Sequence, residues 1–381
     1  MDRSKRKQVT IIYRMLPQYR VDFFEQLRSM LDAEGVDLNL LYSKAISNVK
    51  KDEAHLPWGT IVPQMKLSIS GKHLLYQRLP KSIYDSSLII LMQENKILSN
   101  YVVSFLARRR GIRVALWGHG INFQEQSAGL SNWWKKQYSS KVDWWFAYTD
   151  KVAQLVQSMP FPGDRITVVN NAIDTKSLIK ALGEVSESQK QALREKLGLG
   201  PGPVGIYCGG MYPEKRLDFL FEACETVRRE VPGFELILIG AGPDARIAEE
   251  FAATRPWVHY VGPMFGLERV TYFSLAEIFL MPGLVGLAVL DSFALGTPIV
   301  TTKYPFHSPE IDYVTDRQNG LISDDDVSAY ARAVTGALTD PGLLPYLRDK
   351  AQQSAQTYTV EAMAAKFAAG VLQAIQAPSA G

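Results

Sequence analysis

Runs of apolar, often β-branched residues alternate along this chain with segments of helical periodicity. In the first half the apolar runs lie at 9–13, 36–42, 87–92, 113–118, 144–149 and 166–171. In the second half they lie at 204–210, 234–242, 258–262, 277–282, 298–302 and 319–323. Short continuous apolar runs are typical of strands covered on both faces. The pattern therefore predicts parallel sheets.

Helical patterns separate these runs. After Val21, the residues Phe24, Leu27 and Leu31 recur at helical spacing. Further helices are expected at 98–109, at 186–197, from Leu217, near Leu287, and at 327–338 and 359–376. Residues 44–80 look irregular because prolines and a glycine interrupt them.

Alternation of strand and helix predicts an α/β fold with two doubly wound domains. We expect an N-terminal domain at 1–172, a second domain at 173–358, and a C-terminal helix at 359–381 that packs back toward the first domain. In such sheets ligands bind at the carboxyl ends of the strands. Two facing sheets would thus place the chemistry in an interdomain cleft.

Length and composition fit this organisation. The 381 residues are 46% hydrophobic and 21% charged, which suits two ordinary globular cores. Cys208 and Cys224 are too few for a disulfide framework or a cysteine zinc site, so we expect reduced core thiols. No signal peptide or run of 18 apolar residues is apparent. We expect a cytoplasmic protein, at most peripheral on the inner face of the membrane.

Charge is distributed unevenly. Residues 1–170 hold 24 Lys and Arg against 14 Asp and Glu, whereas the remainder has an acidic excess. Basic residues cluster at Arg3–Lys7, at Arg108–Arg110 and at Lys135–Lys136, where Trp133 and Trp134 precede the lysines. A basic half indicates an anionic partner. The charges alone leave nucleic acid, an anionic membrane and a phosphorylated substrate open, while Trp beside Lys suits a lipid interface.

Two segments of the second half could bind an anionic ligand. In GGMYPEKRLDFL, Gly209 and Gly210 end a strand and Lys215 precedes a helix, where a phosphate is favoured. In MPGLVGLAVLDSFALGTPIV, a turn through Gly286 and Leu287 leads into a helix that carries Asp291. A carboxylate there could accept hydrogen bonds from two hydroxyls. Surface positions for both charged side chains are the simpler alternative.

Two other patterns are set aside. Asp324, Asp325 and Asp326 contain a DxD pattern, but they directly precede a helical segment and are expected to cap it rather than hold metal. Gly240 and Gly242 form part of a GxGxxG fingerprint whose third glycine is absent, so no nicotinamide site is expected.

Several motifs, in order, resemble the group 1 family of retaining glycosyltransferases. They are WGHG at 117–120, ITVVNNAID at 166–174, EK at 214–215, LILIGAGP at 236–243, VG at 261–262 and GTP at 296–298. LPQYRVDFF at 16–24, FHSPEIDY at 306–313 and NGL at 319–321 resemble a branch that assembles bacterial surface polysaccharides. The resemblance spans nearly the whole chain.

The resemblance implies the GT-B fold, in which two doubly wound domains flank the active site, and a nucleoside-diphosphate-sugar donor such as a UDP-sugar. It implies that Lys215 binds the donor diphosphate, Asp291 the ribose, and Val261 and Gly262 the base. It implies that His119 approaches the donor sugar, and no metal or other cofactor is expected. Arg14, Tyr19, Arg20 and Glu310 are candidate acceptor or sugar contacts.

Three positions depart from the family pattern. Gly283 stands where the family has the first of two glutamates, and Asp291 is shorter than the second. Gly210 stands where an arginine accompanies the lysine. Arg14, Arg20 or Arg216 could supply the lost charge, and Glu310 the lost acid.

The function implied is transfer of a sugar, with retention of configuration, to a glycan or to a lipid-linked acceptor such as a polyprenyl diphosphate. The partners expected are the nucleotide sugar, that acceptor and an anionic membrane surface, with no nucleic acid. The departures also support a second hypothesis, a non-catalytic nucleotide-sugar-binding or partner subunit. A third is another GT-B enzyme, such as an epimerase or a phosphorylase.

Overall fold

A computed structural model describes residues 6–45, 53–69, 72–119 and 140–378. The chain divides into two compact units, Met1–Ile173 with Val360–Gly381, and Asp174–Thr359. Each is an α/β unit built on a parallel sheet, which confirms the predicted fold class.

The first unit contains a seven-stranded parallel sheet in the order β3-β2-β1-β6-β7-β8-β9. Its strands are β1 (Lys7–Ile12), β2 (Val36–Tyr42), β3 (Thr60–Ile61), β6 (Leu88–Met92), β7 (Arg113–Gly118), β8 (Trp144–Ala147) and β9 (Ile166–Val168). The central strands are buried throughout because helices cover both faces. An antiparallel hairpin, β4 (Gln64–Ile69) and β5 (Lys72–Gln77), occupies the segment that looked irregular in the sequence.

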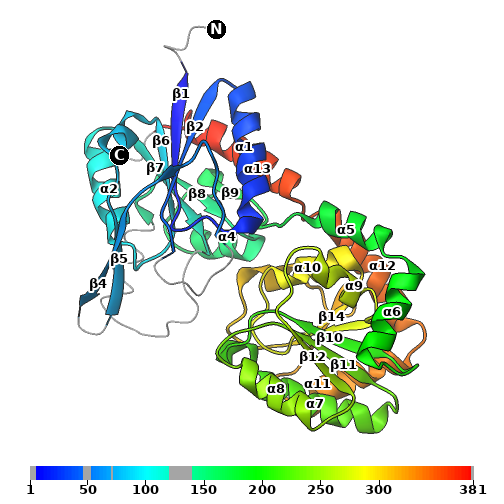
Figure 1. Ribbon diagram of the computed structural model, residues 1–381. Helices are drawn as coiled ribbons and strands as arrows, with labels where there is room; N and C mark the ends of the chain where they lie inside the picture. The colour runs from blue at the N-terminus through cyan, green and yellow to red at the C-terminus, as the bar shows by residue number, and fades with distance from the viewer. Residues whose placement is uncertain (1–5, 46–52, 70–71, 120–139, 379–381) are drawn as a thin grey trace. The chain divides into compact units, whose positions relative to one another are not determined.

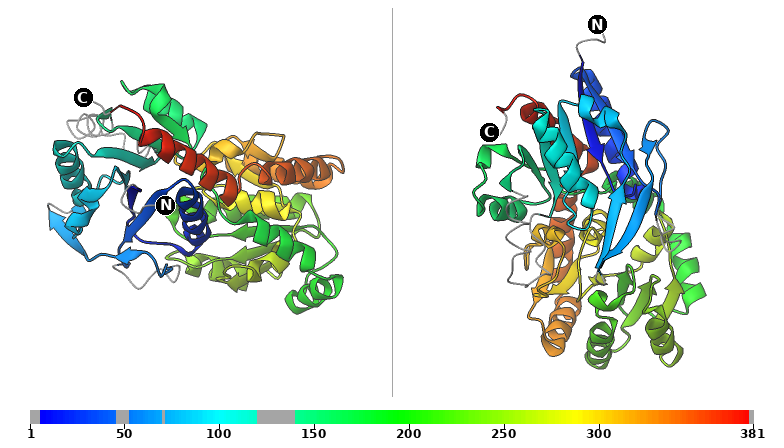
Figure 2. Two further views of the ribbon diagram at one scale, coloured as in Figure 1. Left: turned by 90° about the horizontal axis from the view of Figure 1, so that it is seen from above. Right: turned by 90° about the vertical axis from the view of Figure 1, so that its left-hand side faces the viewer.

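The helices described in the first unit are α1 (Val21–Ala33), α2 (Leu98–Arg109), α4 (Asp150–Gln157) and the C-terminal α13 (Val360–Ala374). Short 3-10 turns lie at Gln18–Arg20, Lys81–Asp85 and Gly163–Arg165. α13 packs along α1, as the views in Figures 1 and 2 agree, so the end of the chain completes the fold begun by its first residues.

A buried arginine lies at the centre of this packing. The Arg20 side chain is 1% exposed and lies beside the Trp117 ring, with the guanidinium carbon 5.3 Å from its centroid. The guanidinium donates to the side-chain oxygen of Asn171 and, at 3.5 Å, to the carbonyl of Ala172. The Met363 sulfur of α13 lies 3.4 Å from it. Arg20 thus links the start of α1, the segment that follows β9, and the C-terminal helix α13.

The second unit contains a six-stranded parallel sheet in the order β12-β11-β10-β13-β14-β15. Its strands are β10 (Val204–Cys208), β11 (Glu235–Ile239), β12 (Val258–Gly262), β13 (Ile278–Leu280), β14 (Ile299–Thr302) and β15 (Gly320–Ser323). All six coincide with predicted strands to within a few residues.

Eight α-helices are described in the second unit. They are α5 (Thr175–Glu184), α6 (Glu187–Leu197), α7 (Leu217–Glu230), α8 (Ala245–Ala253), α9 (Glu268–Phe273), α10 (Ala288–Leu295), α11 (Val327–Thr339) and α12 (Leu343–Ala355). 3-10 turns lie at Pro213–Lys215 and Pro309–Tyr313. α7 packs with α8 and α11 on one face of the sheet, whereas α10 packs with α5 and α12 on the other (Figure 1).

Strand order locates the ligand crevice of each sheet. In the second unit the chain winds outward from β10 to β12 and then returns to place β13 on the other side of β10. The first unit reverses in the same way between β1 and β6. Such reversals open a crevice at the carboxyl ends of the two central strands. Cys208 and Met281 therefore mark one crevice, and Tyr13 and Gln93 the other.

Replacing Arg20 with methionine should destabilise the first unit by about 2–3 kcal/mol, because buried acceptors at Asn171 and Ala172 lose their donor. Urea unfolding followed by tryptophan fluorescence measures the loss. Arg28→Met is the matched control, since Arg28 is an exposed residue of α1, the helix that Arg20 precedes, and stacks on Trp58. Equal midpoints for the two variants would contradict the structural role of Arg20.

Candidate functional site

Lys215 is a buried cation at the crevice of the second unit. It ends the 3-10 turn Pro213–Lys215 after β10, and its side chain is 5% exposed. Its Nζ donates to the carbonyl of Leu284 and lies 3.7 Å from the Met281 sulfur, but it forms no ion pair with a carboxylate of the described residues. Burial lowers the pKa of Lys215 to about 8.

Gly283 allows the backbone to enclose this lysine. A β-carbon at position 283 would lie 2.3 Å from the carbonyl oxygen of Glu214 and 2.6 Å from that of Lys215. The amide of Leu284 donates to the same Glu214 carbonyl at 2.8 Å. Two backbone segments are thus in direct contact, and a glutamate at this position would displace the turn that carries Lys215. This contact explains the first departure from the family pattern in physical terms.

His307 supports the same turn. Its Nδ1 accepts a hydrogen bond from the amide of Val285 at 3.0 Å, and its Nε2 donates to the carbonyl of Thr302 at 2.9 Å. Burial lowers the pKa of His307, and the neutral ring satisfies both bonds. The histidine therefore connects the turn after β13 to the end of β14.

Asp291 lies in the first turn of α10 and is 6% exposed. Its Oδ1 accepts from Nη2 of Arg269, which belongs to α9, at 2.7 Å. Burial raises the pKa of Asp291, and the positive charge of Arg269 opposes that rise. The Nε of Arg269 is also buried and has no hydrogen-bond partner among the described residues. Sequence reasoning missed Arg269, because only the position of α9 brings it to Asp291.

Cys208, at the end of β10, lies close to all three of these charged groups. Burial raises the pKa of its thiol to about 12, and the charges of Arg269, Asp291 and Lys215 all act on it. A thiol with such a pKa stays protonated and unreactive at neutral pH. The crevice thus gathers two cations and one acid around an inert thiol.

The remaining donor candidates lie along the same carboxyl edge. Gly209 and Gly210 follow β10, and the Tyr212 ring lies over Gly210, 2.7 Å from where its β-carbon would stand. Val261 and Gly262 end β12, and Gly262 accepts from the amide of Gly240 at 3.0 Å. Gly286 and Leu287 immediately precede α10, with Leu287 at its N-cap. Their contacts with a donor stay predictions.

The candidates of the first unit are dispersed. Arg14 pairs with Glu94 at 3.2 Å at the crevice between β1 and β6, and Lys96 contacts the same carboxylate. His119 is exposed after β7, with its ring edge-on to Tyr148 and centroids 4.5 Å apart. Tyr19 is 38% exposed. Arg20 is buried as described above, so we assign it a structural role rather than a sugar contact.

Glu310 belongs to the second unit, within the 3-10 turn Pro309–Tyr313, and is 2% exposed. It follows the loop that His307 holds. Its part in replacing the missing acid stays a prediction. Trp133, Trp134, Lys135 and Lys136 lie outside the described residues.

Asp326, the last acid of the triplet, caps α11, as predicted. Asp326 accepts from the amide of Ala329 at 2.8 Å, while Asp324 pairs with Lys303. Asp325 pairs with Arg216, which has a φ of 57° and stacks on Phe219. Within the described residues, no group of three or more His, Cys, Asp or Glu side chains is arranged to hold a metal ion.

Gly240 and Gly242 serve packing. A β-carbon at either position would lie 2.1 Å from a backbone oxygen, that of Gly209 or of Met211. The amides of Gly209 and Met211 in turn bond the carbonyls of Ile239 and Ala241. The glycines therefore bring the turns after β10 and β11 into contact, which accounts for them without a dinucleotide.

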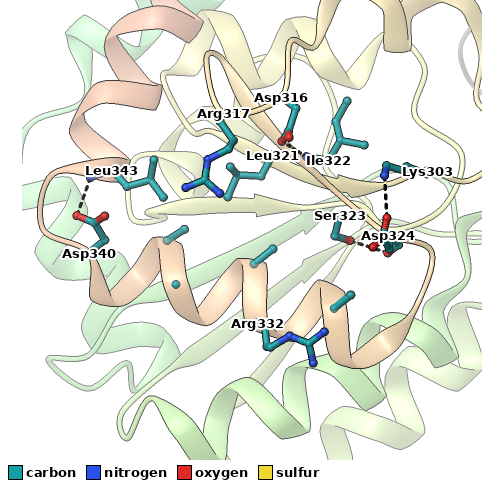
Figure 3. A pocket seen from close by; sticks show the side chains of 14 residues that line it. Lys303, Asp316, Arg317, Leu321, Ile322, Ser323, Asp324, Arg332, Asp340 and Leu343 are labelled. Atoms are coloured by element: carbon teal, nitrogen blue, oxygen red, sulfur yellow. Dashed lines mark hydrogen bonds and ion pairs between the residues drawn. The ribbon is translucent and has the colours of Figure 1, made fainter.

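Figure 3 shows a separate hollow of about 490 Å³ along β15 and α11. Lys303, Arg317 and Arg332 line it together with Asp316, Asp324 and Asp340. Its acids are already engaged: Asp324 pairs with Lys303, Asp316 accepts from the amide of Ile322, and Asp340 caps the turn before α12. None of the candidate site residues lines this hollow.

The chain is similar to several known proteins. The family described as "Glycosyl transferases group 1" matches residues 202–340, which lie within the second unit. A GDP-mannose-dependent alpha-(1-6)-phosphatidylinositol monomannoside mannosyltransferase of Mycolicibacterium smegmatis is 31% identical over 163 residues, 39% of this chain and 42% of that protein. The chain therefore spans less than half the length of this relative.

An alpha-monoglucosyldiacylglycerol synthase of Acholeplasma laidlawii is 22% identical over 330 residues, 85% of this chain and 75% of that protein. Among solved structures, sucrose-phosphate synthase of Thermosynechococcus elongatus matches 98% of this chain and 100% of its own, with a TM-score of 0.70 and 16% identity. HepE of Anabaena with UDP-glucose matches 96% of this chain and 99% of its own, with a TM-score of 0.67 and 12% identity.

The order of the motifs, the two doubly wound units and these similarities agree. The chain has the GT-B fold, and residues 202–340 of its second unit match the group 1 glycosyltransferase family.

Proposed function

We propose that this protein transfers a sugar from a nucleoside-diphosphate sugar to a glycolipid acceptor, with retention of configuration at the anomeric carbon. The observation that carries the proposal is Lys215, a buried ammonium at the crevice between β10 and β13 without a carboxylate partner among the described residues. A buried charge is costly unless it is paired. The diphosphate of a donor would supply the missing counter-charge.

Lys215 would stabilise the negative charge that develops as the donor's C1–oxygen bond breaks and the electron pair passes to the diphosphate. The acceptor hydroxyl would attack C1 from the same face and give its proton to a leaving phosphate oxygen. No covalent nucleophile is required for this step. Asp291 would bind the ribose, and His119 of the first unit would contact the sugar.

The choice of a glycolipid acceptor rests on two observations. The two relatives named above carry names that place phosphatidylinositol mannoside or diacylglycerol in their reactions. The first unit also presents Val102 and Phe105 on α2, 44% and 56% exposed, beside the basic run Arg108–Arg110. The Arg109 guanidinium lies 4.6 Å from the Phe105 centroid. Apolar and basic groups together suit an anionic lipid surface.

In the described segments, no helix has the length and apolar character needed to cross a bilayer. We propose peripheral attachment at the cytoplasmic face of the membrane through α2. A lipid-linked glycan, such as one on a polyprenyl diphosphate, is the acceptor class that fits this attachment in polysaccharide assembly.

A non-catalytic nucleotide-sugar-binding subunit is the second candidate, favoured by the backbone contact that excludes an acid at Gly283. Turnover separates the two. We expect purified protein to release UDP or GDP from a nucleotide sugar in the presence of lipid acceptors, and His119→Ala to lower that rate at least tenfold with little change in nucleotide affinity. Nucleotide-sugar binding without turnover across donors and acceptors would favour the subunit.

Lys215→Ala should weaken binding of the diphosphate by about 1.5–3 kcal/mol, since a charge-assisted contact is lost. Wild-type affinity should fall between pH 7 and 9, because Lys215 loses its proton near pH 8 in the free protein, and the variant should lose this pH dependence. Calorimetry with UDP and GDP measures both effects. Lys303→Ala, which removes an exposed lysine of the same unit, is the control. Unchanged affinity and an unchanged pH profile would remove Lys215 from the site.

The protein should sediment with anionic vesicles at low salt and be released at high ionic strength, because attraction to lipid headgroups is screened. Phe105→Ser with Arg109→Gln should reduce sedimentation severalfold. Phe265→Ser is the matched control, since Phe265 is 59% exposed but belongs to the second unit. Absence of pelleting by the wild type with anionic vesicles at low salt would point to a soluble acceptor.

A further inference from the structure

The crevice of the second unit lacks the arginine expected at Gly210, and the residues predicted to replace it are engaged elsewhere. Arg216 pairs with Asp325 and stacks on Phe219. Arg20 is buried within the first unit, and Arg14 pairs with Glu94 there. A second cation for the diphosphate must therefore come from another element.

Arg269 has the chemistry for this role. It enters the crevice from α9, on the crossover that joins edge strand β12 to central strand β13. Among the described residues, Nη2 donates to the Asp291 carboxylate at 2.7 Å, while the buried Nε–H has no acceptor. A guanidinium presents its donors as a rigid fork that matches two phosphate oxygens. An unsatisfied buried donor on such a fork indicates a ligand acceptor.

We propose that Arg269 replaces the absent arginine: it pairs with Asp291 in the structure and moves to the donor diphosphate when a nucleotide binds. This inference rests on the proposed donor site. A diphosphate carries more negative charge than one carboxylate and offers several acceptors to the same fork, so the exchange is favourable. The move releases Asp291 Oδ1 for the ribose hydroxyls. One residue thus couples recognition of the phosphates to recognition of the sugar of the nucleotide.

The alternative is that Arg269 only holds Asp291 in place and keeps it ionised. The two roles predict different dependence on the phosphates. If Arg269 binds the diphosphate, its removal lowers the affinity of the protein for the nucleoside diphosphate but not for the nucleoside. A positioning residue affects both ligands by the same factor, because each uses Asp291 through its ribose.

Affinities for UDP and GDP are measured first on the full-length wild type, and the tighter nucleotide and its nucleoside are then used. Arg269→Gln should weaken binding of the nucleoside diphosphate at least tenfold and binding of the nucleoside less than twofold. Arg269→Lys should recover part of the loss, since it keeps the charge without the fork. Arg255→Gln is the control, because Arg255 pairs with Glu225 in a more exposed ion pair of the same unit, just before β12 at the amino end of that strand.

Arg269→Gln leaves the buried Asp291 without its partner and could impair folding. The comparison is therefore repeated in the Asp291→Asn background, where no uncompensated acid remains. In that background Arg269→Gln should again weaken binding of the nucleoside diphosphate at least tenfold. No additional loss in that background, or equal losses for diphosphate and nucleoside, would overturn the role of Arg269 while leaving the donor site standing. Failure of the wild type to bind either nucleoside diphosphate would overturn the donor site and this inference together.

Discussion

The position of Lys215 in the second unit depends on the contact between the backbone of Gly283 and that of Glu214–Lys215. With no side chain at 283, the turn after β13 lies directly on the turn after β10, and the Leu284 amide bonds the Glu214 carbonyl. That contact encloses Lys215, whose Nζ bonds the Leu284 carbonyl. His307 fixes the next residue, Val285, to the end of β14. The absence of a side chain at position 283 thus allows the close packing around Lys215.

Much of the fold could be predicted because strands buried on both faces need continuous apolar runs, and such runs are visible without structure. The hairpin β4–β5 was missed, since Met65 and Leu67 are exposed and their strand carries no buried run. The helix α12 was also missed. Its Pro345 stands in the first turn, where an amide has no partner within the helix, so it does not interrupt α12.

The candidate site was predictable only where the chain itself brings residues to a strand end. Lys215 and Asp291 follow β10 and β13 closely, so their sequence context places them at the carboxyl edge. Arg269 reaches Asp291 through the packing of α9, which no local pattern reports. Arg20 shows the opposite case: a charged residue in a polar stretch is buried because Trp117 and Met363, distant in sequence, close over it.

Electrostatics connects the stability of the second unit to its ligand. A lysine whose pKa falls from 10.5 to about 8 on folding opposes folding at neutral pH by roughly 3 kcal/mol. The sign follows from the protons: between pH 8 and 10.5 the unfolded chain binds more of them, so the cost is complete below pH 8 and vanishes as the pH rises past 10.5. A bound anion would raise the pKa again and remove that cost. The burial that destabilises Lys215 therefore strengthens the binding of whatever anion neutralises it.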